Sequence, residues 1–151
     1  MKGIATFLMF ETGAEEAVNY YLQQFPDAKV ISKHGEGTPQ YMVEFELQGH
    51  RLMAYNGGSD DFKFALGTSL FINCETQDEV DRLWEKLSDG GRQMDCGWVQ
   101  DRWGMYWQIC PTVMAKYLRD PDQEKAGRAF KAMLTMQKLD IDKLTKAYEG
   151  K

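Results

Sequence analysis

One pattern occurs twice in the chain at an offset of 64 residues, as Gly3-Ile-Ala-Thr-Phe-Leu-Met-Phe-Glu-Thr12 and again as Gly67-Thr-Ser-Leu-Phe-Ile-Asn-Cys-Glu-Thr76. A glutamate follows each threonine three residues later, at Glu15 and Glu79. Thr-x-x-Glu is the capping box of a helix start, because the threonine and glutamate oxygens accept backbone N–H groups that have no partner within the helix. The repeat therefore predicts two copies of a strand that leads into a helix.

Apolar residues recur at helical spacing after each capping box, which indicates helices with one buried face. The first stripe comprises Ala14, Val18, Tyr21, Leu22 and Phe25, and the second comprises Val80, Leu83, Trp84 and Leu87. Pro26-Asp27 and Asp89-Gly90-Gly91 are the expected helix ends.

Strands are expected after each helix, near 28–33, 40–48 and 51–56 in the first copy and near 92–98 and 105–110 in the second. Each copy is therefore interpreted as a β-α-β-β-β unit, with residues 57–61 as the linker. The tail is expected to be helical over 112–118, over about 121–137 after Asp120-Pro121, and from Asp140 to about Glu149.

Size and charge exclude several classes of protein. A chain of 151 residues suits one domain with its own core. A net charge of −5 disfavours nucleic acid and anionic membrane surfaces as partners. No apolar run is long enough to span a membrane, and the start lacks a signal peptide. Three cysteines without a CxxC motif favour reduced thiols in the cytoplasm.

The tandem units resemble the vicinal oxygen chelate superfamily, which includes glyoxalase I, extradiol dioxygenases and bleomycin-resistance proteins. Within it the chain resembles the PhnB-like group, whose members often carry the name 3-demethylubiquinone-9 3-methyltransferase. The residues that carry this resemblance include Phe7-Leu8-Met9-Phe10, Tyr20-Tyr21, Asn56-Gly57-Gly58, Asn73-Cys74-Glu75-Thr76, Cys96-Gly97-Trp98, Asp101-Arg102-x-Gly104 and Trp107-Gln108.

The resemblance implies an α+β fold in which tandem βαβββ repeats form a cleft-shaped, eight-stranded mixed sheet with helices outside. Residues 1–151 would then be a single domain, with repeat 1 at about 3–56, repeat 2 at about 67–111 and a C-terminal helical extension at 112–151. Because sheet edges need covering and symmetric dimers are common, we expect a homodimer.

In the superfamily a divalent metal is held by side chains from the first and last strand of each unit. The corresponding positions here are Ala5, Met53, Ser69 and Gln108. Alanine and methionine are not ordinary ligands for such a metal, and His34 and His50 are the only histidines. We therefore expect no tightly held metal and no cofactor.

The methyltransferase name implies S-adenosylmethionine, which usually binds a Gly-rich loop between a strand and a helix. The best glycine pairs are Gly35-Glu36-Gly37 and Gly57-Gly58, and neither leads into a predicted helix. The sequence does not support that activity.

Side chains that alternate with the core positions of the strands are candidates for lining the cleft, as a largely apolar and aromatic surface with a few polar groups. These candidates are Gln108, Tyr106, Arg51, Tyr55, Ser69, Asn73, Phe7, Phe71, Met53 and Cys110. The alternative is that these side chains fill the cleft and that nothing binds there.

Metal-independent binding of a small molecule in the cleft is the function expected, and an acidic protein suits cationic ligands. The alternative is an enzyme, a lyase, isomerase or transferase, acting on a small metabolite through Gln108 and a polar neighbour such as Ser69 or Asn73. A covalent mechanism would need Cys110, and a purely structural module is a third class.

Overall fold

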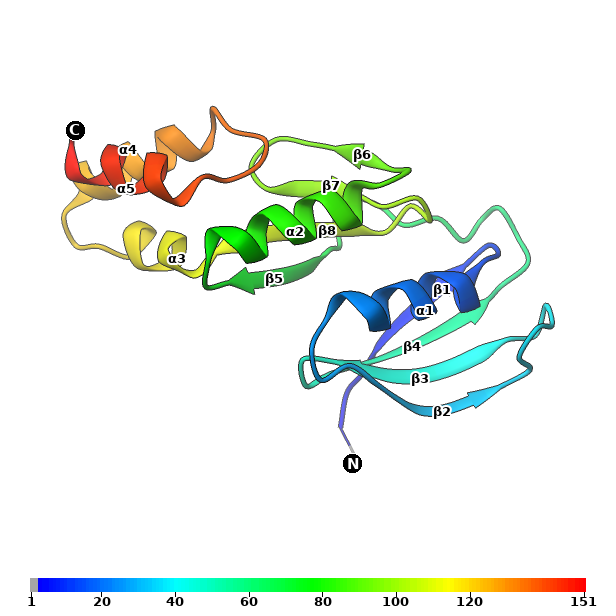
Figure 1. Cartoon of the computed structure of the whole chain (residues 1–151). Helices are drawn as coiled ribbons and strands as arrows, with labels where there is room; N and C mark the ends of the chain where they lie inside the picture. Colours follow the sequence, from blue (N-terminus) through cyan, green and yellow to red (C-terminus); the bar gives the residue numbers. More distant parts are fainter. Residues whose placement is uncertain (1–2) are drawn as a thin grey trace. The chain divides into compact units, whose positions relative to one another are not determined.

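The computed structural model describes residues 3–151. The chain divides into two compact units, Met1–Lys63 and Phe64–Lys151, and the boundary lies just beyond the predicted linker. Each unit holds one four-stranded sheet (Figure 1).

Unit 1 contains β1 (Thr6–Phe10), α1 (Ala14–Gln24), β2 (Lys29–His34), β3 (Met42–Leu47) and β4 (His50–Asn56). The strand order is β1-β4-β3-β2, and only the β1–β4 pair is parallel. Alternate side chains such as Leu8, Phe45 and Leu52 are buried on the face that packs against α1. The other face of the sheet is called open face 1.

The first helix begins differently from the sequence prediction. Its N-cap is Gly13, in the left-handed region at φ 81°, and no side chain of the cap accepts a hydrogen bond. The amide of Ala14 instead donates to Oδ1 of Asn56, 2.9 Å away at the end of β4. Glu15 accepts from the amide of Gly37 at 2.8 Å, so the predicted Thr12–Glu15 capping box is wrong.

Unit 2 repeats the topology with β5 (Leu70–Cys74), α2 (Gln77–Ser88), β6 (Arg92–Gln93), β7 (Trp98–Gln100) and β8 (Tyr106–Pro111). Its strand order, β5-β8-β7-β6 with a parallel β5–β8 pair, matches that of unit 1 position by position. Two βαβββ units in tandem confirm the predicted α+β fold. The side of this sheet away from α2 is called open face 2.

The second capping box is present as predicted. Thr76 Oγ1 accepts from the amide of Glu79 at 3.2 Å, and the Glu79 carboxylate accepts from the amide of Thr76 at 3.2 Å. Val80, Leu83, Trp84 and Leu87 are the buried residues of α2. These are the residues of the predicted stripe.

The strand expected over 92–98 is two short strands joined by a turn. Cys96 and Gly97 both have positive φ, 59° and 81°, which reverses the chain. A Cβ on Gly97 would lie 2.8 Å from the carbonyl oxygen of Ile109, so this position also requires close approach of two backbones. The single-strand prediction missed this reversal.

The turn between β7 and β8 is organised by a buried carboxylate. Asp101 is 4 % exposed and accepts from the amides of Trp103 and Met105, each at 3.0 Å. It also accepts from Nε1 of Trp107 at 2.8 Å. One side chain therefore fixes the turn and the first residues of β8.

Three helices follow the second sheet: α3 (Thr112–Leu118), α4 (Gln123–Met133) and α5 (Ile141–Glu149). The first and last match the predicted ranges, and Asp140 caps α5 as expected. The middle helix begins later than predicted because Asp122, rather than Asp120, accepts from its first amides, and it also ends earlier, at Met133. Residues 112–151, which comprise the three helices and the segments that join them, are called the C-terminal extension.

The extension is anchored to the second unit by side chain and backbone. Gln77 Nε2 donates to the carbonyl of Leu139 at 3.1 Å, and its Oε1 accepts from the amide of Ile141 at 2.8 Å. Lys138 forms a 2.6 Å ion pair with Asp81 of α2. Cys96 and Gly97 donate their amides to the carbonyls of residues 136 and 137, both at 2.7 Å.

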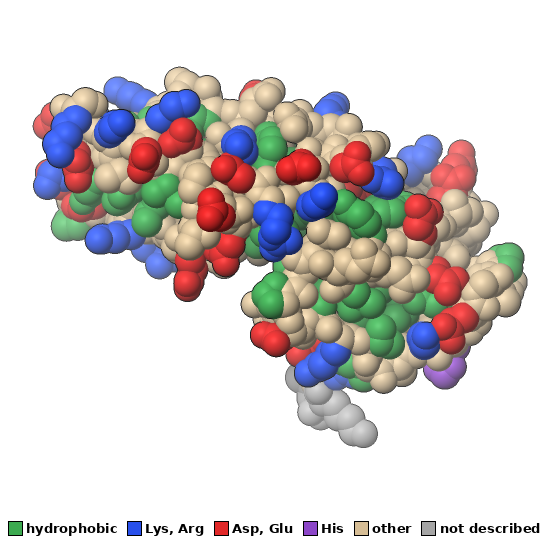
Figure 2. Space-filling view, in the orientation of Figure 1, with side chains coloured by type: hydrophobic (Ala, Val, Ile, Leu, Met, Phe, Trp, Pro, Cys, Tyr) green, Lys and Arg blue, Asp and Glu red, His purple; other side chains and the backbone are tan. Residues whose placement is uncertain are grey.

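Charges of both signs are intermingled on the surface over α2 and the extension (Figure 2). Within residues 3–151, no helix has both the length and the apolar character that crossing a membrane requires.

Candidate functional site

Open face 2 carries a polar pair inside an aromatic surface. The strand register places Gln108 of β8 beside Phe71 of β5 and Trp98 of β7. The neighbouring residues Trp107 and Ile109 are buried under α2, so Gln108 points to the opposite side. Phe71 is 55 % exposed within the chain.

Gln108 and Ser69 lie in direct contact. Nε2 of Gln108 donates to Oγ of Ser69 at 2.8 Å. Both residues are half-buried. Among the hydrogen bonds of the described residues, none reaches Oε1 of Gln108, so the pair offers that acceptor and the serine hydroxyl proton to a ligand.

Three other predicted residues lie on the same face with different surroundings. Tyr106 is mostly buried and pairs with Gln100, whereas Asn73 is exposed. Cys110 pairs with Asn73 across the strands, yet its side chain is 8 % exposed because it packs with Met114 and other core residues of the extension. The extension therefore covers one end of open face 2.

The two buried thiols are poor nucleophiles. Burial raises the pKa of Cys110 to about 11 and that of Cys74 to about 12. Since the thiolate is the reactive form, both sulfurs are protonated at neutral pH. This argues against the covalent mechanism considered for Cys110.

Open face 1 carries the candidates of the first unit. Phe7 is 48 % exposed, and Met53 and Tyr55 are half-buried on the same side of the sheet. Arg51 is ion-paired with Glu44 of the adjacent strand β3. The guanidinium of Arg51 is therefore already neutralised within unit 1.

The residues at the superfamily's metal-ligand positions do not fit a metal ion. Ala5 and Met53 offer no ordinary donor, and Ser69 and Gln108 are bonded to each other. Within residues 3–151, no group of three or more His, Cys, Asp or Glu side chains is placed to hold a metal ion.

The glycine-rich segments do not form a binding site for S-adenosylmethionine either. Gly35 and Gly37 lie in the connection between β2 and β3, and Gly57 and Gly58 follow β4. None of these four glycines opens a helix, and neither sheet is the parallel, doubly wound kind that holds this cofactor.

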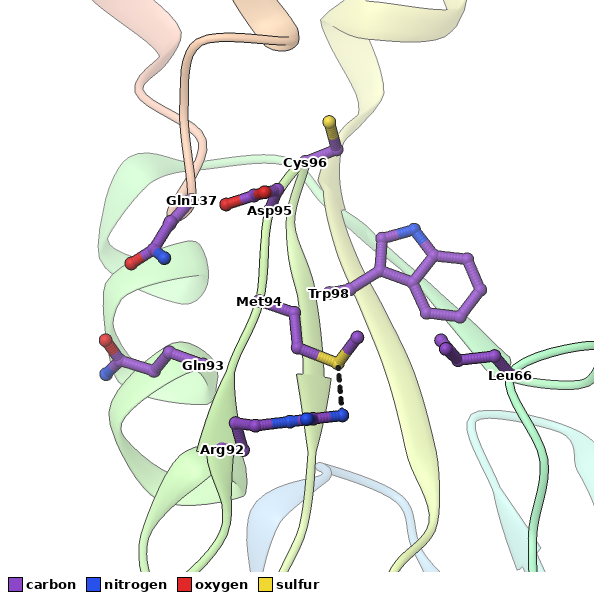
Figure 3. A pocket seen from close by; sticks show the side chains of 8 residues that line it. All are labelled: Leu66, Arg92, Gln93, Met94, Asp95, Cys96, Trp98 and Gln137. Atoms are coloured by element: carbon purple, nitrogen blue, oxygen red, sulfur yellow. Dashed lines mark hydrogen bonds between the residues drawn. The ribbon is translucent and has the colours of Figure 1, made fainter.

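Unit 2 also contains a hollow that the sequence did not predict. It measures about 500 Å³ and lies at the β6 edge (Figure 3). Its lining residues are Leu66, Arg92, Gln93, Met94, Asp95, Cys96, Trp98 and Gln137. A strand interrupted at residues 94–97 gave no periodic signal that could have grouped these side chains.

The fold and site define a tandem βαβββ protein with a polar and aromatic sheet face. The family model described as 3-demethylubiquinone-9 3-methyltransferase matches residues 2–110. The chain belongs to this family. The match ends at β8, so the C-terminal extension lies outside it.

One solved structure agrees with this assignment, and a second shares the fold. A PhnB protein from Bacillus cereus, labelled 3-demethylubiquinone-9 3-methyltransferase, is 30 % identical, with a TM-score of 0.66 over 74 % of this chain and 100 % of that one. A Pseudomonas aeruginosa protein is 19 % identical, with a TM-score of 0.60 over 74 % and 98 % of the two chains.

The fold is also shared with a fosfomycin resistance protein. FosX from Listeria monocytogenes, in complex with Mn(II) and a dihydroxypropylphosphonic acid, is 14 % identical, with a TM-score of 0.53 over 77 % of this chain and 98 % of that one. This likeness concerns the fold alone. A search of curated proteins finds no match.

Proposed function

We propose that this protein binds a small organic molecule at open face 2 without the help of a metal ion. The observation that carries the proposal is the Gln108–Ser69 pair, which presents hydrogen-bonding groups between Phe71 and Trp98. Small-molecule sites typically combine an apolar, aromatic surface with a few fixed polar groups.

The pair suits a ligand that carries a carbonyl or hydroxyl group. Ser69 accepts from Gln108, which leaves its own proton available to a ligand oxygen. Oε1 of Gln108 can accept from a ligand hydroxyl or amine. We expect binding without a metal because the side chains at positions 5, 53, 69 and 108 do not form a set of metal ligands.

A thermal-shift screen of metabolites and of cationic and anionic drugs tests the proposal. We expect hits whose shift is lost in Gln108→Ala and in Tyr106→Ala. The matched control is Gln123→Ala, since Gln123 is an exposed glutamine at the start of α4. Hits that keep their full shift in both site variants, or a screen without hits, would contradict the proposed site.

Metal independence has its own measurement. We expect dialysed protein to contain far less than one equivalent of transition metal, and we expect ligand shifts to survive chelation by EDTA. Near-stoichiometric zinc, nickel, manganese or iron that is lost in Gln108→Ala would overturn this part of the proposal.

An enzymatic role is the second candidate, favoured by the same pair. Ser69 could donate to a substrate carbonyl and polarise it, as in a lyase, isomerase or transferase. NMR spectra of each screening hit incubated with the protein distinguish the two roles. Conversion that stops in Ser69→Ala would establish catalysis, and unchanged spectra would leave binding as the function.

We also propose a homodimer that works in the cytoplasm. Three free cysteines suit a reducing compartment. The strand β2 lies at an edge of the unit 1 sheet and carries the exposed apolar side chains of Val30 and Ile31. A second subunit that covers this edge would bury them. Light scattering at micromolar concentration should give twice the mass of one chain; the mass of a single chain would exclude the dimer.

A further inference from the structure

The hollow at the β6 edge continues the surface of open face 2. Arg92 pairs with Gln100, and Trp98 pairs with Gln108. Val99, between Gln100 and Trp98, is fully buried on the helix side. Arg92 and Trp98 therefore lie on the same side of the sheet as Gln108.

The two ends of the hollow differ in charge. Figure 3 shows Arg92 at one end, Asp95 and Gln137 at the other, and Met94 between them, with Trp98 and Leu66 along one side. Leu66 is 50 % exposed and Trp98 is half-buried, so both offer apolar surface to a ligand.

Arg92 differs from most arginines of the chain. Arg51, Arg102 and Arg128 each form an ion pair with a carboxylate. The contact of the Arg92 guanidinium within residues 3–151 is a long one of 3.8 Å to the thioether sulfur of Met94, and none of the ion pairs found there includes it. A methionine sulfur is a weak acceptor, so the guanidinium retains its capacity to bind an anion.

The wall opposite Arg92 is held by the C-terminal extension. The amides of Cys96 and Gly97 donate to the carbonyls of Met136 and Gln137, both at 2.7 Å. This backbone contact fixes the turn that carries Asp95 against the segment that carries Gln137. Because the family match ends at residue 110, Gln137 is a contribution of the extension.

We propose that this hollow binds an organic anion. Arg92 binds the carboxylate or phosphate of the ligand. The flat apolar part of the ligand contacts Trp98, Leu66 and Met94. At the other end, Asp95 and Gln137 accept hydrogen bonds from a donor group of the ligand. The inference rests on the proposed small-molecule function and names the ligand class. The net charge of the chain favours a cationic ligand, but the guanidinium of Arg92 makes this hollow suited to an anion, because the charge inside a site determines which ligand charge is bound there.

Three probes that share a naphthalene ring and differ in their charged group test the charge: naphthoate, naphthyl phosphate and naphthylmethylamine. We expect at least one anion to bind more tightly than the amine by about tenfold or more, measured by calorimetry, since a charge-assisted bond is formed with Arg92. The tighter of the two anions identifies the group as carboxylate or phosphate.

Variants assign the effect to Arg92. We expect Arg92→Gln to weaken the anion by about tenfold and Arg92→Lys to weaken it less, because lysine keeps the charge but not the bidentate fork. Arg119→Gln is the matched control, an exposed arginine at the end of α3 outside the hollow. Circular dichroism checks that each variant is folded.

The proposal is overturned if no probe binds, if the amine binds as tightly as the anions, or if Arg92→Gln leaves the anion affinity unchanged. These outcomes are distinct from failure of the proposed function. Screening hits that need Gln108 but not Arg92 would retain small-molecule binding while removing the anion from this hollow.

Discussion

The two units of this chain have the same strand order but organise it by different contacts. In unit 1 the helix begins at a glycine, and its first amide donates to Asn56 at the end of β4, the strand that pairs with β1. In unit 2 a local capping box begins the helix, a buried carboxylate fixes the last turn, and three further helices cover part of the sheet.

The same strand order can therefore be stabilised by different local contacts in the two units. Separate hydrogen bonds, such as the one to Asn56, organise unit 1, whereas in unit 2 the single buried carboxylate of Asp101 binds three donors. The chain also provides its own reporter, because all four tryptophans, at positions 84, 98, 103 and 107, belong to unit 2. Tryptophan fluorescence therefore follows the unfolding of unit 2 alone.

The largest expected change in stability is at the turn before the last strand of unit 2. Asp101→Ala leaves three donors without their acceptor, two of them on buried residues, so we expect unit 2 to lose about 3–5 kcal/mol of unfolding free energy. Urea unfolding followed by tryptophan fluorescence measures it.

The unit 1 counterpart is Gln48→Asn, in the exposed turn between β3 and β4. Gln48 donates to the carbonyl of Pro26. Asparagine tolerates the positive φ at this position, so we expect a loss below about 1 kcal/mol, measured by circular dichroism. Equal losses in the two turns would remove the contrast between the units.

Glycine substitutions separate backbone strain from close approach. Gly97→Ala combines positive φ with a Cβ 2.8 Å from the oxygen of Ile109, and we expect a loss of about 2–4 kcal/mol. Gly49→Ala has similar φ, 78°, but nothing within 4 Å, and we expect about 1 kcal/mol. If both losses are the same, the contact with Ile109 is unimportant.

The helix starts give a smaller contrast. Thr76→Ala removes a side-chain cap and should cost about 1 kcal/mol, whereas Thr12→Ala should change stability by less than about 0.5 kcal/mol. Asn56→Ala should behave like Thr76→Ala, since Asn56 binds the amide of Ala14. A large effect of Thr12→Ala would restore the predicted first capping box.

The sequence anticipated these elements to different degrees. Helical spacing placed Val80, Leu83, Trp84 and Leu87 on the buried side of α2, and local spacing found the cap at Thr76. It could not find Asn56, because that cap comes from 42 residues away. It also missed the hollow, which needs β6, the turn and Gln137 to meet in space.

The smallest expected effect is on pH dependence. Hydrogen bonds from Lys138 and then Gln77 lower the pKa of Asp81, and one from Tyr148 lowers the pKa of Asp120. A carboxylate with a lowered pKa stabilises the fold above its unfolded pKa of about 3.9, and this contribution is lost as pH falls through the folded value. Both residues are partly exposed, so the loss should be slight.

Amide exchange is the measurement for this effect. Below about pH 4 we expect protection in α5 to decrease, and we expect Asp81→Asn to show the lower protection already at neutral pH. Protection of α5 that is the same in both proteins at every pH would contradict a role for the Asp81–Lys138 pair.

The anchoring of the extension by Gln77 has a consequence for biosynthesis. Every strand pair of the unit 1 sheet can form once residue 56 has left the ribosome. Gln77, however, meets its backbone partner Leu139 only after 62 further residues, which takes about 3–12 s at about 5–20 residues per second. During that interval the emerging second unit lacks the segment that covers Cys110, and this is the period in which a nascent chain would depend most on a chaperone.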